Sequence, residues 1–314
     1  MFNQPFLWEN KNRVLITTHA FADADALGSV LALASHLRSR GLETILLVRE
    51  GAPKTLRFLL GENEAVAPNS LKDHEFDLVV VLDCASSSLT GLDGIGDYKD
   101  SLVNIDHHPD NTFFGAQNLV DTTAASTAEI IYEIIKQDGR TPTSFESTSL
   151  LAGLAGDTGS FKHINATSKT LKMAGELMLH GANLSDIVKN IFKLNDSSQL
   201  KAWSHVIEVS KFDEEKNIIM AAITEEEMRA LGIDEDAFTG VVEVLSTFHK
   251  ASYSAFFRQR GEEVKVSLRS ESFKNFNVSN LAAKFGGGGH KLAAGFSIPG
   301  KLIKKDGEPY IIPS

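Results

Sequence analysis

The sequence predicts an α/β fold: a mostly parallel sheet with helices on both faces, followed by a smaller α+β domain. Short apolar runs alternate with helical periodicity through the first half of the chain. These runs are almost continuously apolar, as are strands buried on both faces of a parallel sheet. Beyond Gly181 the pattern changes to helices, a β-hairpin and a glycine-rich stretch. The length of 314 residues is sufficient for two such domains.

The first domain is predicted to alternate short strands with longer helices. Apolar runs too short for helices predict strands at Arg13–Thr18, Glu43–Val48, Asp77–Leu82 and Leu102–Ile105. Helical periodicity predicts helices at Ala26–Arg40, Ser126–Lys136, Ser147–Leu154 and Ser168–His180, the last ended by Gly181. Because helices separate the strands, we expect neighbouring strands to run parallel.

The second half begins with two helices and continues as a mixed domain. The helices are predicted at Leu184–Phe192 and Ser198–Val209, and the charged run Lys211–Lys216 marks a boundary. Thr224 and Glu227 form a capping box that opens a short helix. The other predicted elements are the strand Asn217–Ala222, the hairpin strands Tyr253–Arg260 and Glu263–Arg269, and the helix Val278–Phe285. The predicted domains are therefore residues 1–182 and 210–314, joined by a helical linker at 183–209.

The composition excludes several classes of protein. Lys and Arg number 31 against 41 Asp and Glu, a net charge of −10, whereas proteins that grip long duplexes usually carry a basic surplus. A nucleic-acid substrate should therefore be short and captured at its ends. The single cysteine, Cys84, excludes an internal disulfide and a multi-cysteine zinc site. The polar first 12 residues and the lack of a long apolar run predict a soluble, cytoplasmic protein without a membrane span.

Aspartate and histidine residues gather in four segments, each at the end of an apolar run or in a glycine-containing turn. The segments are His19–Ser29 with Asp23 and Asp25, then Asp83, Asp106-His107-His108, and Gly156–Phe161 with Asp157. The carboxyl ends of parallel strands meet at one edge of the sheet, so these side chains should converge there. In an extended turn, Asp23 and Asp25 would face one cavity together with His19.

Four converging carboxylates, from Asp23, Asp25, Asp83 and Asp157, would repel one another strongly. Two divalent cations about 3.5–4 Å apart would supply the balancing charge and clamp the attacking and leaving oxygens of a phosphoryl displacement. Carboxylates with imidazoles and no thiolate favour Mn²⁺, with Mg²⁺ or Co²⁺ also compatible, over a closed structural Zn²⁺ site. We also expect Gly28-Ser29 to open a helix whose free amides attract an anion.

Each of these residues also has an ordinary explanation. A single aspartate after a strand is often only a helix N-cap, and a lone His-His pair can be incidental. Four such segments in this order favour a metal site instead. No comparable motif surrounds Cys84, the two tryptophans or six of the histidines, which are predicted to be structural, interface or surface residues. These histidines are His36, His74, His163, His180, His205 and His249.

The four segments resemble the motifs of the DHH (Asp-His-His) phosphoesterase superfamily. Gly286–Phe296 (GGGGHKLAAGF) resembles the signature of the C-terminal domain associated with that superfamily. The resemblance covers nearly the whole chain, and the length is most similar to that of bacterial members that combine oligoribonuclease and 3′-phosphoadenosine 5′-phosphate (pAp) phosphatase activities. One departure is Ala22, where the family usually has proline before the first aspartate. Every ligand position of the family is nevertheless present.

The resemblance implies a role for each motif residue. One cation would be held by His19, Asp23 and Asp83, and the second by Asp25, Asp83, His107 and Asp157, with Asp83 bridging. His108 would contact the scissile phosphate, and Asp106 would orient its neighbours. The far end of the substrate would be held by Gly287, Gly288, Gly289 and His290.

Two arginines on the predicted hairpin are further candidates for substrate binding. Arginine can contact a phosphate with two parallel hydrogen bonds, so Arg258 and Arg269 would suit a phosphate site. The ordinary alternative is a solvated strand residue.

These observations predict a two-domain, Mn²⁺-dependent phosphodiesterase with its cleft between the domains. Its expected substrates are very short single-stranded RNA and dinucleotides, released as mononucleotides, and pAp, converted to AMP. A homodimer is compatible with the sequence. The alternative is a soluble cyclic- or linear-dinucleotide (c-di-AMP or pApA) phosphodiesterase. A family II pyrophosphatase is less favoured, because that branch lacks Gly286–His290. A non-catalytic nucleotide-binding module is disfavoured because such a module would have lost metal ligands.

Overall fold

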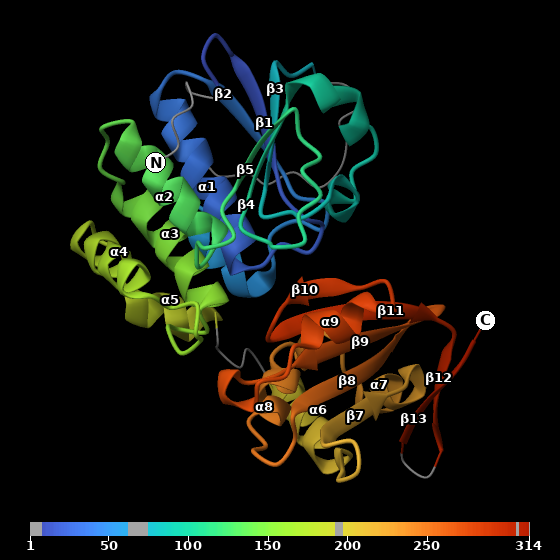
Figure 1. Ribbon diagram of the computed structural model, residues 1–314. Coiled ribbons are helices and arrows are strands. Elements are labelled where there is room, and N and C mark those ends of the chain that lie inside the picture. Colours follow the sequence, from blue (N-terminus) through green and yellow to red (C-terminus); the bar gives the residue numbers. More distant parts are fainter. Residues whose placement is uncertain (1–7, 62–74, 192–196, 306–307, 314) are drawn as a thin grey trace. The chain divides into compact units, whose positions relative to one another are not determined.

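A parallel, five-stranded sheet organises the first part of the chain (Figure 1). The computed structural model describes residues 8–61, 75–191, 197–305 and 308–313, which divide between two units, Met1–Lys193 and Leu194–Ser314. The strands of the first unit are β1 (Arg13–Thr17), β2 (Glu43–Leu47), β3 (Leu78–Leu82), β4 (Leu102–Asp106) and β5 (Gln117–Val120). Their order is β2-β1-β3-β4-β5, and every neighbouring pair is parallel. All five carboxyl ends therefore lie at one edge.

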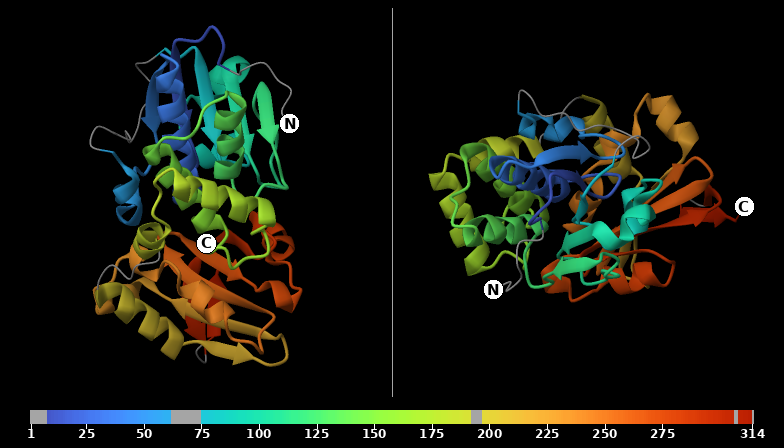
Figure 2. Two further views of the ribbon diagram at one scale, coloured as in Figure 1. Left: turned by 90° about the vertical axis from the view of Figure 1, so that its left-hand side faces the viewer. Right: turned by 90° about the horizontal axis from the view of Figure 1, so that it is seen from above.

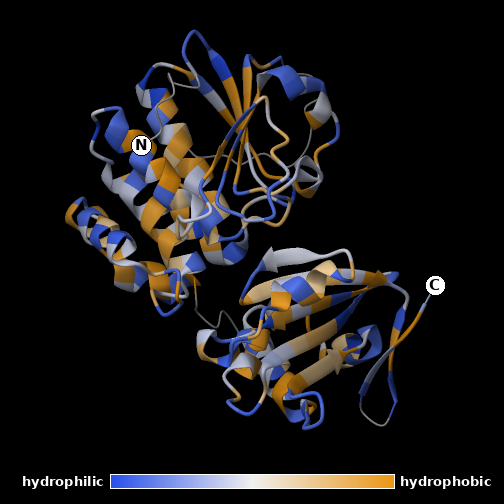
Figure 3. Ribbon diagram, viewed as in Figure 1, coloured by the Kyte–Doolittle hydropathy of each residue, from blue (hydrophilic) through white to orange (hydrophobic). Residues whose placement is uncertain are grey.

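Residues alternate between two cores along each central strand. Val14 and Ile16 pack against α1 (Ala24–Ser39), α2 (Thr127–Gln137) and α3 (Ser144–Asp157), the helices that lie on one side of the sheet in Figures 1 and 2. Leu15 points to the other face, where Leu92 and Ile95 of the segment around the short helix η3 (Ile95–Ser101) cover the sheet. Burial on both faces explains why β3 is apolar throughout and its neighbours β1 and β4 are largely so, as the hydropathy colouring shows (Figure 3).

The second unit contains a mixed six-stranded sheet in the order β10-β11-β9-β8-β7-β6. Its strands are β6 (Lys211–Asp213), β7 (Ile218–Ile223), β8 (Tyr253–Arg260), β9 (Glu263–Arg269), β10 (Gly288–His290) and β11 (Ala293–Pro299). β7 and β8 are parallel, and the other neighbours are antiparallel. One face packs against α6 (Ser197–Glu208), α7 (Glu225–Leu231) and α8 (Val241–Ser246), and the other against α9 (Val278–Ala283). A separate hairpin joins β12 (Lys301–Lys305) to β13 (Glu308–Ile312).

The predicted fold class is confirmed, and most predicted elements are present within one or two residues at their ends. The capping box at Thr224 and the β8–β9 hairpin are confirmed. The prediction that α1 starts at Ala26 was wrong by two residues, since Asp23 caps the helix and α1 begins at Ala24. Strand β5 was missed because its residues Gln-Asn-Leu-Val are only partly buried and do not form an apolar run. The strands β6 and β10–β13 and the helix α8 were also missed.

The two helices predicted as a linker pack on different units. In α5 (Leu184–Ile191), Ile187 belongs to the core of the first unit, whereas Ala202 and Val206 of α6 belong to a core of the second. Phe192, which ended the predicted first helix, lies outside the described residues. The division at 182 and 210 stays a prediction. Among the described residues, no helix combines the length and the hydrophobicity needed to cross a bilayer.

The contact between α1 and α3 depends on a glycine. A Cβ atom on Gly28 of α1 would lie 2.3 Å from the backbone oxygen of Ser149 in α3, so Gly28→Ala must push the two helices apart. We expect this variant to lose about 1–3 kcal/mol of stability in urea unfolding, although alanine favours helix formation. The matched control is Gly175→Ala in α4 (Ser168–Leu179), where a Cβ meets nothing within 4 Å. Equal unfolding midpoints for the two variants would contradict this packing.

Candidate metal centre

The first group of candidate ligands consists of His19, Asp23 and Asp83. One donor atom from each lies within 4.8 Å of the others. His19 and Asp23 follow β1, Asp83 follows β3, and His19 Nε2 is 3.8 Å from Asp83 Oδ2. Asp23 is also the N-cap of α1, because its carboxylate accepts hydrogen bonds from the amides of Asp25 and Ala26 at 3.0 Å each.

The second group consists of Asp25, His107 and Asp157, again with donor atoms within 4.8 Å of one another. His107 Nε2 lies 3.1 Å from Asp157 Oδ2 and 4.0 Å from Asp25 Oδ2. The other ring nitrogen, Nδ1, lies 3.4 Å from the backbone oxygen of Ala124. A contact of this kind fixes the tautomer and the direction of a metal-binding imidazole.

The extended conformation predicted for the Asp23–Asp25 turn was wrong, although the two carboxylates do lie close enough to repel each other. The two carboxylates were expected to face one cavity from an extended segment, but Asp25 lies in the first turn of α1 and joins a different group from Asp23. Gly28 and Ser29 do not open the helix either. They lie further into α1, where Gly28 packs against α3 and the Ser29 hydroxyl lies 3.4 Å from Asp25 Oδ1. The N-cap at Asp23 explains both differences, since it moves the helix start toward the N-terminus.

Asp83 lies between the two groups. Its Oδ2 faces His19, and its Oδ1 lies 3.6 Å from His107 Nε2. The backbone of Asp83 is in the left-handed region at φ 52°, which is costly for a residue with a Cβ. Its amide donates a 2.9 Å hydrogen bond to the backbone oxygen of Ile105 on β4, and this bond anchors the turn. The strained turn thus directs one carboxylate toward both groups.

A buried polar network supports Asp106 and His108. The Nδ1 of His108 lies 2.8 Å from Asp106 Oδ1, and Asn111 Nδ2 donates to Asp106 Oδ2 at 2.6 Å. Asn111 also donates to Asn104 Oδ1 at 2.8 Å, and Asn104 donates to the backbone oxygen of Cys84 at 3.2 Å. Asn104 and Asn111 were not predicted as site residues from the sequence. The available signal was an asparagine inside the apolar run of β4, where a buried amide needs partners.

Asp157 is the last residue of α3 and begins a tight turn. Gly159, Ser160 and Phe161 all have positive φ values, of 55°, 58° and 65°. The backbone oxygen of Asp157 accepts a 3.2 Å hydrogen bond from Asn165 Nδ2. Two consecutive non-glycine residues in the left-handed region are rare and often occur beside functional groups.

Burial and mutual repulsion shift the pKa values of this cluster. Burial raises the pKa of Asp25 to about 8, and the charge of Asp83 adds to the shift. Burial likewise raises the pKa of Asp83 to about 7 and that of Asp157 to about 6. Burial opposes the charged form of His107, yet the hydrogen bond to Asp157 holds its pKa well above the usual value.

In the Asp106–His108 pair, hydrogen bonds outweigh the effect of burial on the pKa of the carboxylate. Burial alone would raise the pKa of Asp106, but the hydrogen bonds from His108 and Asn111 lower it to about 2. The same bond raises the pKa of His108 to about 9 despite burial. Asp106 is therefore ionised and fixed in place. The carboxylates of Asp25 and Asp83 instead retain protons near neutral pH in the absence of added positive charge, whereas Asp157 loses its proton at lower pH.

The donor set fits divalent cations. Oxygen and imidazole nitrogen donors without thiolates suit hard or borderline metals. Replacing the retained protons by cations would relieve the repulsion between the buried carboxylates. The structure brings together His19, Asp23, Asp25, Asp83, Asp106, His107, His108 and Asp157. The assignment of each residue to a particular cation stays a prediction.

The predicted substrate residues lie in the second unit. Gly288, Gly289 and His290 form β10, and a Cβ on Gly287 would lie 2.1 Å from the backbone oxygen of Gly295 in β11. At least part of the glycine-rich signature is therefore explained by the close approach of two chain segments.

The two predicted phosphate-binding arginines each contact a glutamate. Arg258 Nη2 lies 3.4 Å from Glu235 Oε2, and Arg269 Nε lies 2.7 Å from Glu243 Oε1. In the register of β8 and β9, Arg258 is paired with Lys265. The phosphate-binding role of both arginines stays a prediction.

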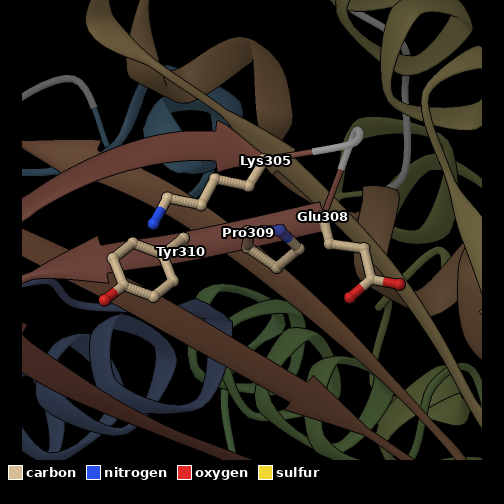
Figure 4. A pocket seen from close by; sticks show the side chains of 4 residues that line it. All are labelled: Lys305, Glu308, Pro309 and Tyr310. Carbon is tan, nitrogen blue, oxygen red and sulfur yellow. The ribbon is translucent and has the colours of Figure 1, made fainter.

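A pocket on the β12–β13 hairpin is separate from these residues (Figure 4). It is lined by Lys305, Glu308, Pro309 and Tyr310. The Lys305 ammonium lies 3.8 Å from the centre of the Tyr310 ring, a cation–π contact. No predicted site residue lines this pocket, so it is not part of the candidate centre.

A parallel sheet with carboxylates and imidazoles gathered at its carboxyl edge defines an α/β protein with a candidate site for divalent cations. Residues 13–155 match the DHH family, N-terminal domain, and residues 215–306 match the DHHA1 domain. The chain is 31% identical over 289 residues to "Bifunctional oligoribonuclease and PAP phosphatase NrnA" of Thermus thermophilus, covering 91% of this chain and 84% of the relative. The chain belongs to the DHH family.

Two further relatives differ in how much of their length is matched. The chain is 28% identical over 295 residues to "Cyclic-di-AMP phosphodiesterase GdpP" of Geobacillus thermodenitrificans, covering 89% of this chain but only 44% of that protein. The crystal structure of an exopolyphosphatase-related protein from Bacteroides fragilis has a TM-score of 0.83 at 24% identity, covering 92% of this chain and 88% of that one. This last likeness supports the fold.

We expect the stability of the metal-free protein to fall as the pH rises from about 5 to about 8. The folded-state pKa values of Asp25, Asp83 and Asp157 lie above 3.8, and those of His107 and His108 lie above 6.5. The folded protein therefore binds more protons than the unfolded chain in this window, so raising the pH favours unfolding. The check is thermal unfolding of chelator-treated protein across this range.

Mn²⁺ added to the same samples should raise the melting temperature most at the highest pH. Deprotonation there leaves more charge for a cation to neutralise, and binding competes with fewer protons. A Mn²⁺-induced shift that stays constant or shrinks as the pH rises would contradict this account of the cluster.

Proposed function

We propose that this protein is a metal-dependent phosphodiesterase. It hydrolyses very short oligoribonucleotides to mononucleotides and converts pAp to AMP. The observation that carries the proposal is the pair of ligand groups, His19–Asp23–Asp83 and Asp25–His107–Asp157, with Asp83 facing both. Two cations that share one carboxylate are the arrangement that suits displacement at phosphorus. Family membership and the name of the Thermus thermophilus relative support the same chemistry.

In the proposal, one cation is held by His19, Asp23 and Asp83, and the second by Asp25, Asp83, His107 and Asp157. Mn²⁺ is the proposed metal, and Mg²⁺ or Co²⁺ are compatible with the same donors. When bound, the cations supply charge for the phosphoryl oxygens and activate water for attack. The proposed ligands include no thiolate. Cys84 is a buried free thiol, and burial raises its pKa to about 12, so it stays protonated and unreactive.

His108 is proposed to contact the scissile phosphate. Its Nδ1 lies 2.8 Å from Asp106 Oδ1, a contact that sets the plane of the ring, and Nε2 is the nitrogen proposed to face the substrate. Asp106 is itself held at both oxygens, by His108 on one side and Asn111 on the other. The ionised carboxylate therefore keeps His108 protonated and in position to stabilise negative charge on a non-bridging oxygen.

The second unit is proposed to bind the rest of the substrate. Cross-strand partners share a face, so Arg258 with Lys265, and Ser267 with Gly295, lie on the same face of the β8-β9-β11 sheet. This face combines cationic side chains with small residues that leave room for a sugar or base. Arg258, Arg269, Gly287, Gly288, Gly289 and His290 are the proposed contacts.

Short substrates are favoured by the charge of the whole chain. A net charge of −10 disfavours long polyanions, which bind through many phosphate contacts. A few positively charged side chains near the site suffice to bind a dinucleotide or pAp. The likeness to the cyclic-di-AMP phosphodiesterase makes c-di-AMP and pApA the alternative substrates to be tested.

We expect Asp83→Ala to abolish Mn²⁺-dependent cleavage of a short RNA. The value of kcat/KM should fall by more than ~100-fold, because substituting a residue that only supports a metal ligand already costs up to ~100-fold. The matched control is Asp97→Ala, which removes an exposed carboxylate from η3 of the same unit. Cleavage by Asp83→Ala at the rate of the control would refute the proposed centre.

We expect the cleavage rate to fall as the RNA lengthens from dinucleotides to strands several times longer, with mononucleotides as products. End-labelled RNAs of graded length, incubated with Mn²⁺, measure both the preference and the direction of attack. Competition with pAp, c-di-AMP and pyrophosphate ranks the alternatives. Faster hydrolysis of c-di-AMP than of pAp and dinucleotides would favour the cyclic-dinucleotide phosphodiesterase instead.

A further inference from the structure

Thr127, the first residue of α2, contacts both groups of candidate ligands. It is fully buried, at 0% exposure. Its amide donates a 2.6 Å hydrogen bond to Asp25 Oδ2, and its hydroxyl donates a 3.0 Å hydrogen bond to Asp83 Oδ1. One residue therefore joins a carboxylate of the second group to the carboxylate that faces both groups.

The start of α2 binds the whole carboxylate of Asp25. The amide of Ala128 donates to Asp25 Oδ1 at 2.9 Å, so consecutive amides hold both oxygens. The first amides of a helix have no partner within the helix, and its N-terminus carries partial positive charge. Both effects favour the ionised form of Asp25 and fix the plane of its carboxylate.

The hydroxyl of Thr127 fixes the direction of one carboxylate oxygen of Asp83. Asp83 is not itself part of a helix and lies in a left-handed turn. The direction of its side chain therefore depends on contacts of this kind. With Oδ1 bonded to Thr127, that oxygen stays within 3.6 Å of His107, and Oδ2 stays on the side of His19. The bond thus sets how the two oxygens are divided between the groups.

The position of Thr127 is itself well supported. Ser126 caps α2 and accepts from the amide of Glu129 at 3.3 Å, while Glu129 Oε2 accepts from the amide of Ala125 at 3.2 Å. The hydroxyl of Thr170 on α4 donates to the same Glu129 oxygen at 3.2 Å. Threonine in a helix is restricted to two χ1 rotamers, and the hydrogen bond to Asp83 selects one of them for Thr127.

We propose that Thr127 is a positioning residue that holds the carboxylates of Asp25 and Asp83 in their binding orientation before cations bind. The inference rests on the proposed metal centre and goes beyond it, since Thr127 is a ligand in neither proposed site. Because Asp83 serves both cations, loss of the hydroxyl weakens binding at both sites together. The backbone bonds to Asp25 survive any substitution other than proline, so the hydroxyl alone is the testable part.

The experiment compares Thr127→Val, which keeps the shape and removes the hydroxyl, with Thr127→Ser, which keeps the hydroxyl. Mn²⁺ binding to chelator-treated protein is measured by calorimetry, and the Mn²⁺ concentration for half-maximal cleavage of a dinucleotide is measured alongside. We expect Thr127→Val to weaken Mn²⁺ binding ~10–100-fold and to raise the activation midpoint in parallel. Thr127→Ser should stay within ~3-fold of the wild type.

Ser126→Ala is the control for general loosening of α2. It removes the N-cap hydrogen bond, lowers the stability of α2, and removes neither bond of Thr127. Circular dichroism confirms that each variant is folded. If Ser126→Ala weakens Mn²⁺ binding as much as Thr127→Val, or if Thr127→Val binds like the wild type, the inference is overturned. If the wild type itself binds no Mn²⁺, the proposed function fails instead, so the two failures are distinguishable.

Discussion

Three carboxylates within reach of one another, two of them buried and that of Asp157 half-buried, are the constraint on which the rest of the first unit depends. Asp25, Asp83 and Asp157 can be ionised together only if positive charge or hydrogen-bond donors surround them. The parallel sheet meets part of this need, because it delivers loops from several strands to one edge. The starts of α1 and α2 supply amide donors to Asp23 and Asp25. The remaining repulsion is what divalent cations would neutralise.

The same constraint reaches into the helix packing. Gly153 of α3 faces Asp25, and a Cβ there would lie 2.6 Å from Asp25 Oδ1. A Cβ on Gly156, one turn further along α3, would lie 2.9 Å from the Cβ of Ala24. α3 must therefore pass close to the first turn of α1 for Asp157, at its end, to reach His107. The close contact between the two helices contributes to stability and also sets the geometry of the candidate centre.

The charged members of the site were predictable from the sequence because each follows an apolar strand or enters a glycine-containing turn. Their supporting residues were not predictable in this way. Thr127 and Asn111 are uncharged, and Thr127 meets Asp25 across 102 positions of the chain, so no local pattern marks it. The extended conformation predicted at Asp25 was wrong for a related reason. Its spacing from Asp23 fits an extended turn and a capped helix equally well, and only the capping bonds decide between them.

In the second unit, buried hairpin strands were predicted to the residue, whereas β10 to β13 were missed because glycine, lysine and proline hide their pattern. The ion pairs found there bear on the proposed phosphate contacts. Glu235 and Glu243 are partly exposed, and pairs of this kind are worth about 1 kcal/mol or less. In the proposed complex, a phosphate would replace these glutamates, and its oxygens would accept parallel bonds from a guanidinium. Under the proposal, the glutamates would hold the guanidinium groups of Arg258 and Arg269 until a substrate phosphate displaces them.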